Sequence, residues 1–289
     1  WRRVEAAGEG PAPRYAVAAA YDPRRQAVRF AGGWAREAIS EVWAWDGAWS
    51  RERSLPAGRY SAGLAANDRQ VVFLGGDDVD RRACDDVWVL GGDAGWRRGT
   101  RPAGPDFGGR HAVVHAPDRA TFLVFGGRPA ALWEWAGVDD WRAHGCPVPA
   151  RAGAAVAYDA ARRRLVVFGG EEAPGPYLDE LWEWDGRAWA QGAGGPPART
   201  NAMLTFDGAR CLLFGGAAAR PGSRWEGLDD LWAWDGQVWE ALATEGERPG
   251  GRARGGFAWD PRRGVGVLFG GVAGSGARPL GDLWELVPP

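Results

Sequence analysis

The chain has 289 residues, of which 45% are hydrophobic and 12% aromatic, and its formal net charge is −2. This charge creates no field that would attract nucleic acid or an anionic membrane, so we expect no nucleic-acid partner. No apolar run approaches the ~18 residues of a membrane helix, and the hydrophobic content suffices for a buried core, so we expect neither membrane insertion nor disorder.

A pair of glycines after an apolar run recurs along the chain at intervals of 43 to 55 residues. The pairs are Gly32-Gly33, Gly75-Gly76, Gly126-Gly127, Gly169-Gly170, Gly215-Gly216 and Gly270-Gly271. An arginine precedes each pair, and eight residues after it comes Asp or Asn. These ring arginines are Arg14, Arg59, Arg110, Arg151, Arg199 and Arg252. Six such copies indicate a repeat architecture, with one unit beginning near each arginine.

Each copy is predicted to form four short strands, which the fourth copy shows in chain order. Residues 152–158 form the first strand, and the β-branched run 165–168 forms the second, which leads into Gly-Gly. Residues 181–184 form the third strand, with two tryptophans at i and i+2 on one face. The Asp-Gly turn at 185–186 reverses the chain into a fourth strand at Trp189. Six such units that close radially make an all-β propeller with almost no helix.

The two ends of the chain are predicted to meet in the sixth blade. The sixth copy stops without a fourth strand, and Trp1 lies 13 residues before Arg14, the spacing that the sixth ring arginine shows to Trp239. We therefore predict that residues 1–4 supply the outer strand of blade 6. Closure in this way makes residues 1–289 one domain, which we expect to be a monomer.

The copies resemble Kelch repeats over nearly the whole chain. The resemblance rests on the double glycine after an apolar strand and on the aromatic-Asp-x-x-x-Trp hairpin at 184–189. A proline two or three residues before the ring arginine, at Pro11 to Arg14, Pro149 to Arg151 and Pro197 to Arg199, adds to it. It implies a six-bladed Kelch-type propeller with four antiparallel strands per blade. It implies little about activity, because function resides in sites built on a fold.

One face of the propeller is predicted to bind a ligand. With four antiparallel strands per blade, the loops between strands 2 and 3 emerge on the face that carries the ring arginines and the connections between blades. Variable loops on a rigid scaffold are the usual place for binding. The predicted ligand-binding residues on this face are Tyr15, Trp34, Tyr60, Phe107, Arg110, His111, Tyr177 and Trp225.

Most ring arginines are predicted to be structural. Five copies carry a carboxylate two residues before the first tryptophan of the third strand, namely Glu41, Asp86, Glu180, Asp230 and Asp282. These carboxylates start strands on the arginine face, so we predict structural ion pairs. The third copy has Ala131 at this position and a short loop. Arg110, with His111 beside it, is therefore the ring arginine that we predict to meet an acidic ligand.

Other notable side chains have simpler interpretations. His111 and His115 lie four residues apart on one predicted strand face, where packing is more common than ligand binding. We expect His144 in solvent and Trp259 in the core. The acidic cluster at residues 77–80 lacks the glycine and the distal glutamate of a calcium loop, so we expect no metal site.

The residue pattern favours a binding protein over an enzyme. We find no metalloprotease, nucleophile-elbow or phosphate-loop motif, so we expect no catalytic residues and no cofactor. Because Tyr, Trp and Arg anchor interfaces, we predict a non-catalytic module that recognises a peptide or protein segment with acidic groups. The alternative is a carbohydrate-active propeller, either lectin-like or a mutarotase, with Trp34 or Trp225 stacking on a sugar. A Kelch-type mutarotase needs only an acid/base pair in the channel mouth. A propeller without any ligand ranks last.

Overall fold

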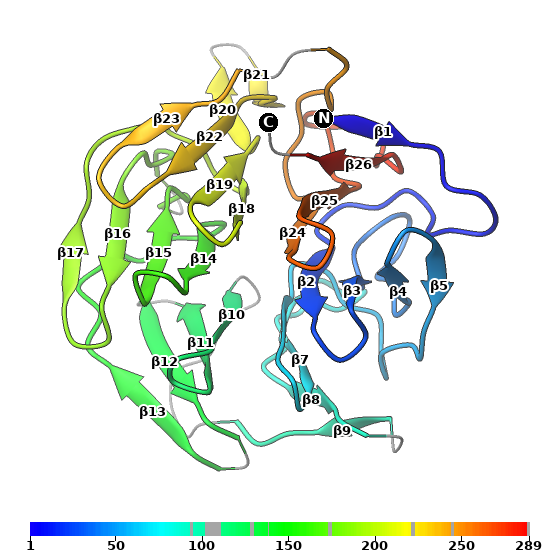
Figure 1. Cartoon of the computed structure of the whole chain (residues 1–289), viewed down its shortest axis with the longest axis horizontal. Helices are drawn as coiled ribbons and strands as arrows, with labels where there is room; N and C mark the ends of the chain where they lie inside the picture. Colours follow the sequence, from blue (N-terminus) through cyan, green and yellow to red (C-terminus); the bar gives the residue numbers. More distant parts are fainter. Residues whose placement is uncertain are drawn as a thin grey trace.

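Six four-stranded antiparallel sheets surround a central axis, which confirms the predicted six-bladed propeller (Figure 1). The structure is a computed structural model that describes residues 1–92, 95–101, 111–127, 130–137, 139–172, 175–220, 223–243 and 246–287. No helix occurs in these ranges.

Five blades are built from consecutive stretches of the chain, and their strands run from the axis outward in chain order. Blade 1 contains β2 (Ala18–Asp22), β3 (Ala27–Ala31), β4 (Val42–Trp45) and β5 (Trp49–Arg51), and blade 2 contains β6 (Gly63–Ala66), β7 (Val71–Leu74), β8 (Val87–Leu90) and β9 (Trp96–Arg98). Blade 3 contains β10 (Ala112–Ala116), β11 (Thr121–Gly126), β12 (Ala131–Trp135) and β13 (Trp141–His144). Blade 4 contains β14 (Ala155–Asp159), β15 (Arg164–Phe168), β16 (Leu181–Trp184) and β17 (Trp189–Gln191), and blade 5 contains β18 (Met203–Phe206), β19 (Cys211–Phe214), β22 (Leu231–Trp234) and β23 (Trp239–Ala241).

Blade 6 joins the two ends of the chain. Its strands are β24 (Gly256–Asp260), β25 (Val265–Phe269), β26 (Leu283–Leu286) and, on the outside, β1 (Arg2–Val4). Strand β1 pairs antiparallel with β26, with Arg3 opposite Trp284, so the two strands lie side by side near the termini (Figure 1). The predicted closure by the N-terminal strand is confirmed.

Blade 5 carries an additional hairpin that the sequence patterns did not predict. Strands β20 (Ala217–Arg220) and β21 (Ser223–Gly227) pair antiparallel within the connection between the second and third strands of the blade. The hairpin reaches blade 6, because the backbone N–H of Gly227 donates a hydrogen bond to the carbonyl of Ala273 at 2.7 Å. Its alanine-rich first strand has no polar–apolar alternation, so the period-2 signal of a strand is missing.

The hydrophobic core is divided among the interfaces between blades. Each of six clusters of buried side chains combines residues from two neighbouring blades. Trp182 and Trp184, two positions apart on β16, pack against the same cluster between blades 3 and 4, as the alternation predicted. The innermost strands contact one another in a closed ring, β2·β6·β10·β14·β18·β24 and back to β2. Blade-to-blade packing therefore supplies most of the buried apolar surface.

The double glycines connect adjacent blades. The N–H of Gly170 donates to the carbonyl of Arg199, in the next blade, at 2.9 Å. The first glycine of this pair, Gly169, has φ +64°, and a methyl group placed there would lie 2.6 Å from the same carbonyl oxygen. Gly215 and Gly270 are arranged alike against the ring arginine of their next blade. Glycine is needed here because of both the backbone conformation and the close approach of the next blade.

Trp259 packs against the hydrophobic cluster between blades 5 and 6, in line with the prediction, but the core does not enclose it completely. It belongs to β24, the innermost strand of blade 6, and its side chain is only half-buried. Its repeat position is the same as that of Tyr158, which is 7% exposed. Trp259 is larger, and the innermost strands border the channel, where no further strand covers them. Part of the indole is consequently exposed to the channel.

Candidate functional site

The predicted ion pairs of the ring arginines are present on the face that bears the strand 2–3 loops, hereafter the upper face. Arg252 and Asp282 form a two-pronged pair with N···O distances of 2.7 and 2.8 Å. The pairs in the described part of the chain are Arg14–Glu41, Arg59–Asp86, Arg151–Glu180, Arg199–Asp230 and Arg252–Asp282.

Each of these carboxylates also accepts a hydrogen bond from the indole two residues later. The donors are Trp43, Trp88, Trp182, Trp232 and Trp284. The hydrogen bond from Arg151 lowers the pKa of Glu180, and burial only partly opposes it. Arg252 is 1% exposed and also donates to the carbonyl of Gly270 at 3.2 Å. These arginines hold the strands of their blades together and are enclosed by them, so they are not positioned to bind an acidic ligand.

Two of the predicted ligand-binding residues cannot be placed. Arg110 and Phe107 lie outside the described residues, so the prediction that Arg110 meets an acidic ligand stays a prediction. Ala131, which stands where the other blades have the carboxylate, begins β12.

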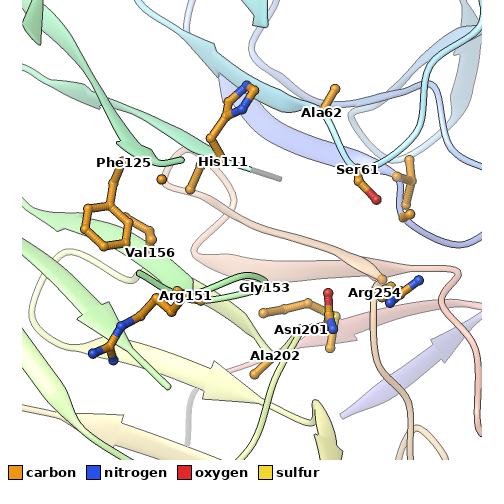
Figure 2. Close-up of a pocket in the computed structure, with 17 residues that line it drawn as sticks. Ser61, Ala62, His111, Phe125, Arg151, Gly153, Val156, Asn201, Ala202 and Arg254 are labelled. Carbon is orange, nitrogen blue, oxygen red and sulfur yellow. The ribbon is translucent and has the colours of Figure 1, made fainter. Parts of the chain in front are cut away.

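A cavity of about 180 Å³ lies at the upper mouth of the channel (Figure 2). Residues from all six blades line it, and they come mainly from the start of each innermost strand. They include Ala16, Ser61, His111, Gly153, Asn201 and Arg254. Five of these, all but His111, lie two positions after a ring arginine.

Five residues around this mouth have left-handed backbone. Their φ angles are 53° at Ala16, 55° at Ser61, 65° at Gly153, 54° at Asn201 and 59° at Arg254. Backbone hydrogen bonds of 2.6 to 3.1 Å link these five residues in a row. Each N–H donates to the carbonyl of the next residue, in the order Ser61, Ala16, Arg254, Asn201 and Gly153. Backbone hydrogen bonds thus fix the mouth, and its chemistry is decided by the side chains at these positions.

His111 is 7% exposed and lines this cavity. Its Nε2 lies 3.0 Å from the carbonyl oxygen of Leu74 in blade 2. It precedes β10, whereas His115 lies within that strand, so the two histidines do not share one strand as predicted. The contact with Leu74 gives His111 a structural role between blades 2 and 3.

Three of the predicted aromatic residues form one cluster, which we call the upper aromatic cluster: Tyr15, Trp34 and Tyr60. Tyr15 and Trp34 exchange two backbone hydrogen bonds of 3.0 and 2.7 Å. The rings of Trp34 and Tyr60 meet edge to face, with centroids 4.9 Å apart and an interplanar angle of 70°. The side chains of all three are half-buried, so they leave aromatic surface accessible on the upper face.

Tyr177 and Trp225 lie on other blades of the upper face. The backbone of Tyr177 pairs with Glu171 in blade 4, and the carbonyl of Trp225 in β21 accepts a hydrogen bond from the N–H of Ser275. Burial raises the pKa of Tyr177, Glu171 raises it further and Arg254 opposes them, so the charge of Arg254 reaches Tyr177. Among the described residues, no ring contact joins Tyr177 or Trp225 to the upper aromatic cluster.

Sequence reasoning missed Arg254. The position two residues after the ring arginine holds Ala16, Ser61, Ala112, Gly153, Asn201 and Arg254 in blades 1 to 6. An arginine in a set of otherwise small or uncharged residues is the signal that could have identified it. Arg254 lines the cavity mouth together with these residues.

Blade 3 contains a polar network around a buried carboxylate near the opposite, lower face. Glu134 accepts two hydrogen bonds of 2.8 Å from Arg119 and one from Thr121, and it lies 2.8 Å from Nε2 of His144. His144 also lies against Trp184, with ring centroids 4.6 Å apart, so it is packed rather than solvated as predicted. The hydrogen bonds from Arg119, ahead of those from Thr121 and His144, lower the pKa of Glu134 from 4.5 to about 2.

Replacing this carboxylate should make stability less sensitive to acid. Because the pKa of Glu134 is lower in the folded chain, its stabilisation is complete above the unfolded value of 4.5 and is lost as the pH falls toward about 2. Glu134→Gln should lower the free energy of unfolding by about 3 kcal/mol at pH 7 and by much less at pH 3. Urea unfolding at both pH values measures this difference. Glu240→Gln, at an exposed partner of Arg210, is the control and should change little. An equal loss at both pH values for Glu134→Gln would contradict the assignment.

No three His, Cys, Asp or Glu side chains come together as a metal site in the described ranges. No helix that could span a lipid bilayer is found in the described part of the chain.

Comparison with known proteins supports the repeat assignment. The sequence model of the KLHDC2/KLHL20/DRC7 Kelch-repeats domain matches residues 133–288. The chain is similar in fold to the solved structure of YjhT, with a TM-score of 0.74 and 18% sequence identity, over 97% of this chain and 96% of YjhT. No curated protein matches the sequence.

Proposed function

The chain belongs to the Kelch-repeat family, and from this premise we propose that it is a non-catalytic binding module whose upper face holds a peptide or protein segment with an acidic group. The observation that carries the proposal is the position of Arg254 in the cavity mouth, next to the upper aromatic cluster.

Arg254 is the cation that best fits an acidic ligand at this mouth. Arg254 lines the cavity, and it carries a long charged side chain at a left-handed position, which costs a residue with a Cβ about 1 kcal/mol relative to glycine. Non-glycine residues in such conformations tend to occur at functional sites. Ala16, Ser61 and Asn201 share this conformation, so the strain belongs to the mouth as a whole, and blade 6 differs from them in carrying a charged residue there.

The upper aromatic cluster adjoins Arg254 through the backbone. The N–H of Ala16 donates to the carbonyl of Arg254 at 2.6 Å, and Ala16 directly follows Tyr15. Trp34 and Tyr60 continue the same surface into blades 1 and 2. Arginine and large aromatic side chains are the residues that most often anchor protein interfaces. An extended segment could thus place a carboxylate at Arg254 and an apolar side chain on the aromatic cluster.

The test is a selection from a random peptide library displayed on phage, followed by dissociation constants for the selected peptides. We expect these peptides to contain Asp, Glu or a free C-terminal carboxylate. Arg254→Gln and Trp34→Ala should each weaken their binding by about tenfold or more, since loss of an interface anchor typically costs over 1 kcal/mol. The control, Arg187→Gln, changes an exposed arginine in a strand 3–4 turn of the lower face.

Selected peptides that lack acidic groups, or that bind Arg254→Gln as tightly as the native chain, would overturn the proposal. Following sugar anomers by NMR in the presence of the protein tests the carbohydrate alternative separately. Accelerated anomer exchange would replace the proposal with a mutarotase.

A further inference from the structure

A second and larger cavity, of about 470 Å³, lies at the other end of the channel. We call it the lower cavity. Its walls are the second halves of the six innermost strands and the turns that follow β2, β10, β14, β18 and β24. Pockets that bind small molecules commonly have volumes of several hundred Å³. None of the predicted ligand-binding residues lines it.

Aromatic side chains surround the lower cavity. Tyr21, Tyr158, Phe206 and Trp259 line it from blades 1, 4, 5 and 6, and each lies seven residues after its ring arginine. In blade 2 the same repeat position is occupied by Ala66. Tyr21, Phe206 and Trp259 are only half-buried, so parts of their rings are exposed to the cavity. Aromatic rings that converge in this way offer a large apolar contact area to a bound ring.

The walls also offer hydrogen-bonding groups. Trp259 donates its backbone N–H to Oγ1 of Thr205 at 3.0 Å, while its indole N–H makes no hydrogen bond within the described residues. The hydroxyl of Tyr21 likewise makes none there. Each innermost strand is paired on one edge only, so the other edge presents backbone N–H and C=O groups toward the channel. A ligand with a polar group therefore finds both donors and acceptors.

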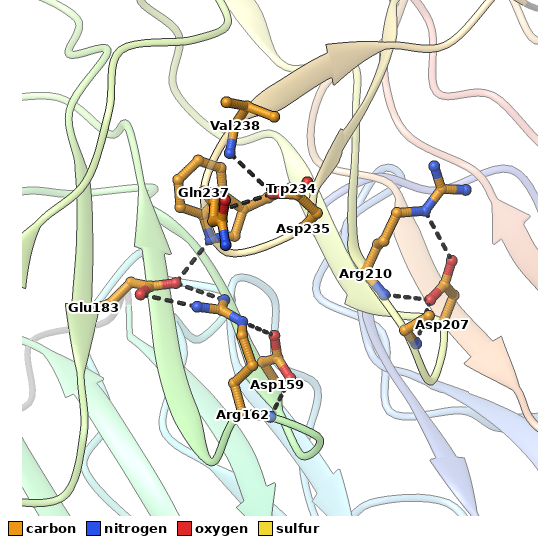
Figure 3. Close-up of polar contacts among 10 residues, drawn as sticks. Asp159, Arg162, Glu183, Asp207, Arg210, Trp234, Asp235, Gln237 and Val238 are labelled. Carbon is orange, nitrogen blue, oxygen red and sulfur yellow. Dashed lines mark hydrogen bonds and ion pairs between the residues drawn. The ribbon is translucent and has the colours of Figure 1, made fainter.

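No arginine lines the lower cavity. Near this face, Arg162 bonds Asp159 at 2.7 Å and forms a fork with Glu183 (Figure 3). Asp207 lines the cavity, but its Oδ1 accepts the backbone N–H groups of Ala209 and Arg210 at 2.7 and 2.6 Å.

Fields of both signs reach the wall. Burial raises the pKa of Tyr21, and Asp260 raises it further while Arg262 opposes. Burial also disfavours the charged form of His115, which for an imidazole means a lower pKa, so the neutral imidazole is favoured at this wall. A charged ligand would lose part of its hydration here without gaining an ion-pair partner among the lining side chains, and burial of an unpaired charge is costly. The charges thus favour a neutral ligand.

We propose that the lower cavity binds an uncharged aromatic small molecule that carries a hydrogen-bonding group. The aromatic side chains contact its ring, and the indole N–H of Trp259 or the strand edges bind its polar group. This site lies at the opposite end of the channel from the upper aromatic cluster and is independent of the peptide-binding proposal.

Three naphthalene probes that differ mainly in charge test the ligand class. 1-Naphthol is neutral, 1-naphthalenesulfonate is an anion, and 1-(aminomethyl)naphthalene is a cation at pH 7. In calorimetric titrations, 1-naphthol should bind with 1:1 stoichiometry and about tenfold or more tightly than either charged probe. Similar affinities for all three probes, tighter binding of a charged probe, or tighter binding of a neutral sugar such as methyl glucoside would overturn the proposal.

Three variants test the location. Trp259→Leu removes the indole and should weaken 1-naphthol binding by about tenfold. Ala160→Trp fills the cavity from an exposed turn residue that lines it, and it should have a similar effect without loss of any core contact. Trp225→Leu, on the upper face, is the matched control and should leave the affinity unchanged. Undiminished binding to Ala160→Trp, or lost binding to Trp225→Leu alone, would contradict the assignment.

Discussion

Gly169→Ala should lower the free energy of unfolding by about 3 kcal/mol or more, whereas Gly264→Ala should lower it by about 1 kcal/mol. The two glycines have nearly the same backbone conformation, with φ of +64° and +65°. The left-handed conformation costs an alanine about 1 kcal/mol at either site. At Gly264 no atom lies within 4 Å of the new methyl group, but at Gly169 the carbonyl oxygen of Arg199 lies at 2.6 Å.

The additional loss at Gly169 comes from the contact between blades. Relief of the clash requires blade 5 to move away, which stretches the hydrogen bond between Gly170 and Arg199, and overpacking of this kind costs about 1–3 kcal/mol. Guanidinium unfolding followed by tryptophan fluorescence measures both variants. Equal losses for Gly169→Ala and Gly264→Ala would show that the double glycine serves the backbone conformation alone.

Arg252→Met should lower the free energy of unfolding by about as much as Gly169→Ala, because it breaks a buried charge pair. The change removes the fork to Asp282 and the hydrogen bonds to the carbonyls of Gly250 and Gly270. The Asp282 side chain is 20% exposed and would keep only the indole of Trp284 as a side-chain donor. Removing one partner of a buried ion pair typically lowers the free energy of unfolding by about 3–5 kcal/mol.

Arg248→Met is the matched control in the same connection between blades. Arg248 pairs with Asp229 at 3.2 Å, but both side chains are about half exposed, so the loss should stay below about 1 kcal/mol. Equilibrium unfolding in guanidinium compares the two variants. A small effect of Arg252→Met on stability, together with weakened peptide binding, would instead make the ring arginines ligand-binding residues.

The fold could be predicted from the sequence because each copy repeats the same local signals. The glycine pair, the Asp-Gly turn and the tryptophans at i and i+2 all recur, and each has a local physical cause. The β20–β21 hairpin could not be predicted in this way, because it belongs to one blade only and its second strand is hydrogen-bonded to blade 6, which is distant in sequence from the repeat signals of blade 5.

The candidate sites were less predictable than the fold. The placement of Tyr15, Trp34 and Tyr60 on one face followed from loop topology, whereas their contact with one another was not predicted. The position of Arg254 at the mouth could not be predicted from the sequence, because its left-handed conformation is set by the ring of hydrogen bonds around the mouth and not by its residue type. The partial exposure of Trp259, which packs against the core, could not be predicted because a repeat position does not reveal where blade packing ends and the channel begins.

The most direct test of the proposed function combines a change in the protein with a change in the peptide. One selected peptide and its counterpart with the acidic residue replaced by the amide are titrated into the native chain and into Arg254→Gln. If Arg254 binds the acidic group, the amide peptide should bind the native chain about tenfold more weakly, yet bind Arg254→Gln as well as the acidic peptide does. Equal losses for the amide peptide in both proteins would contradict the account.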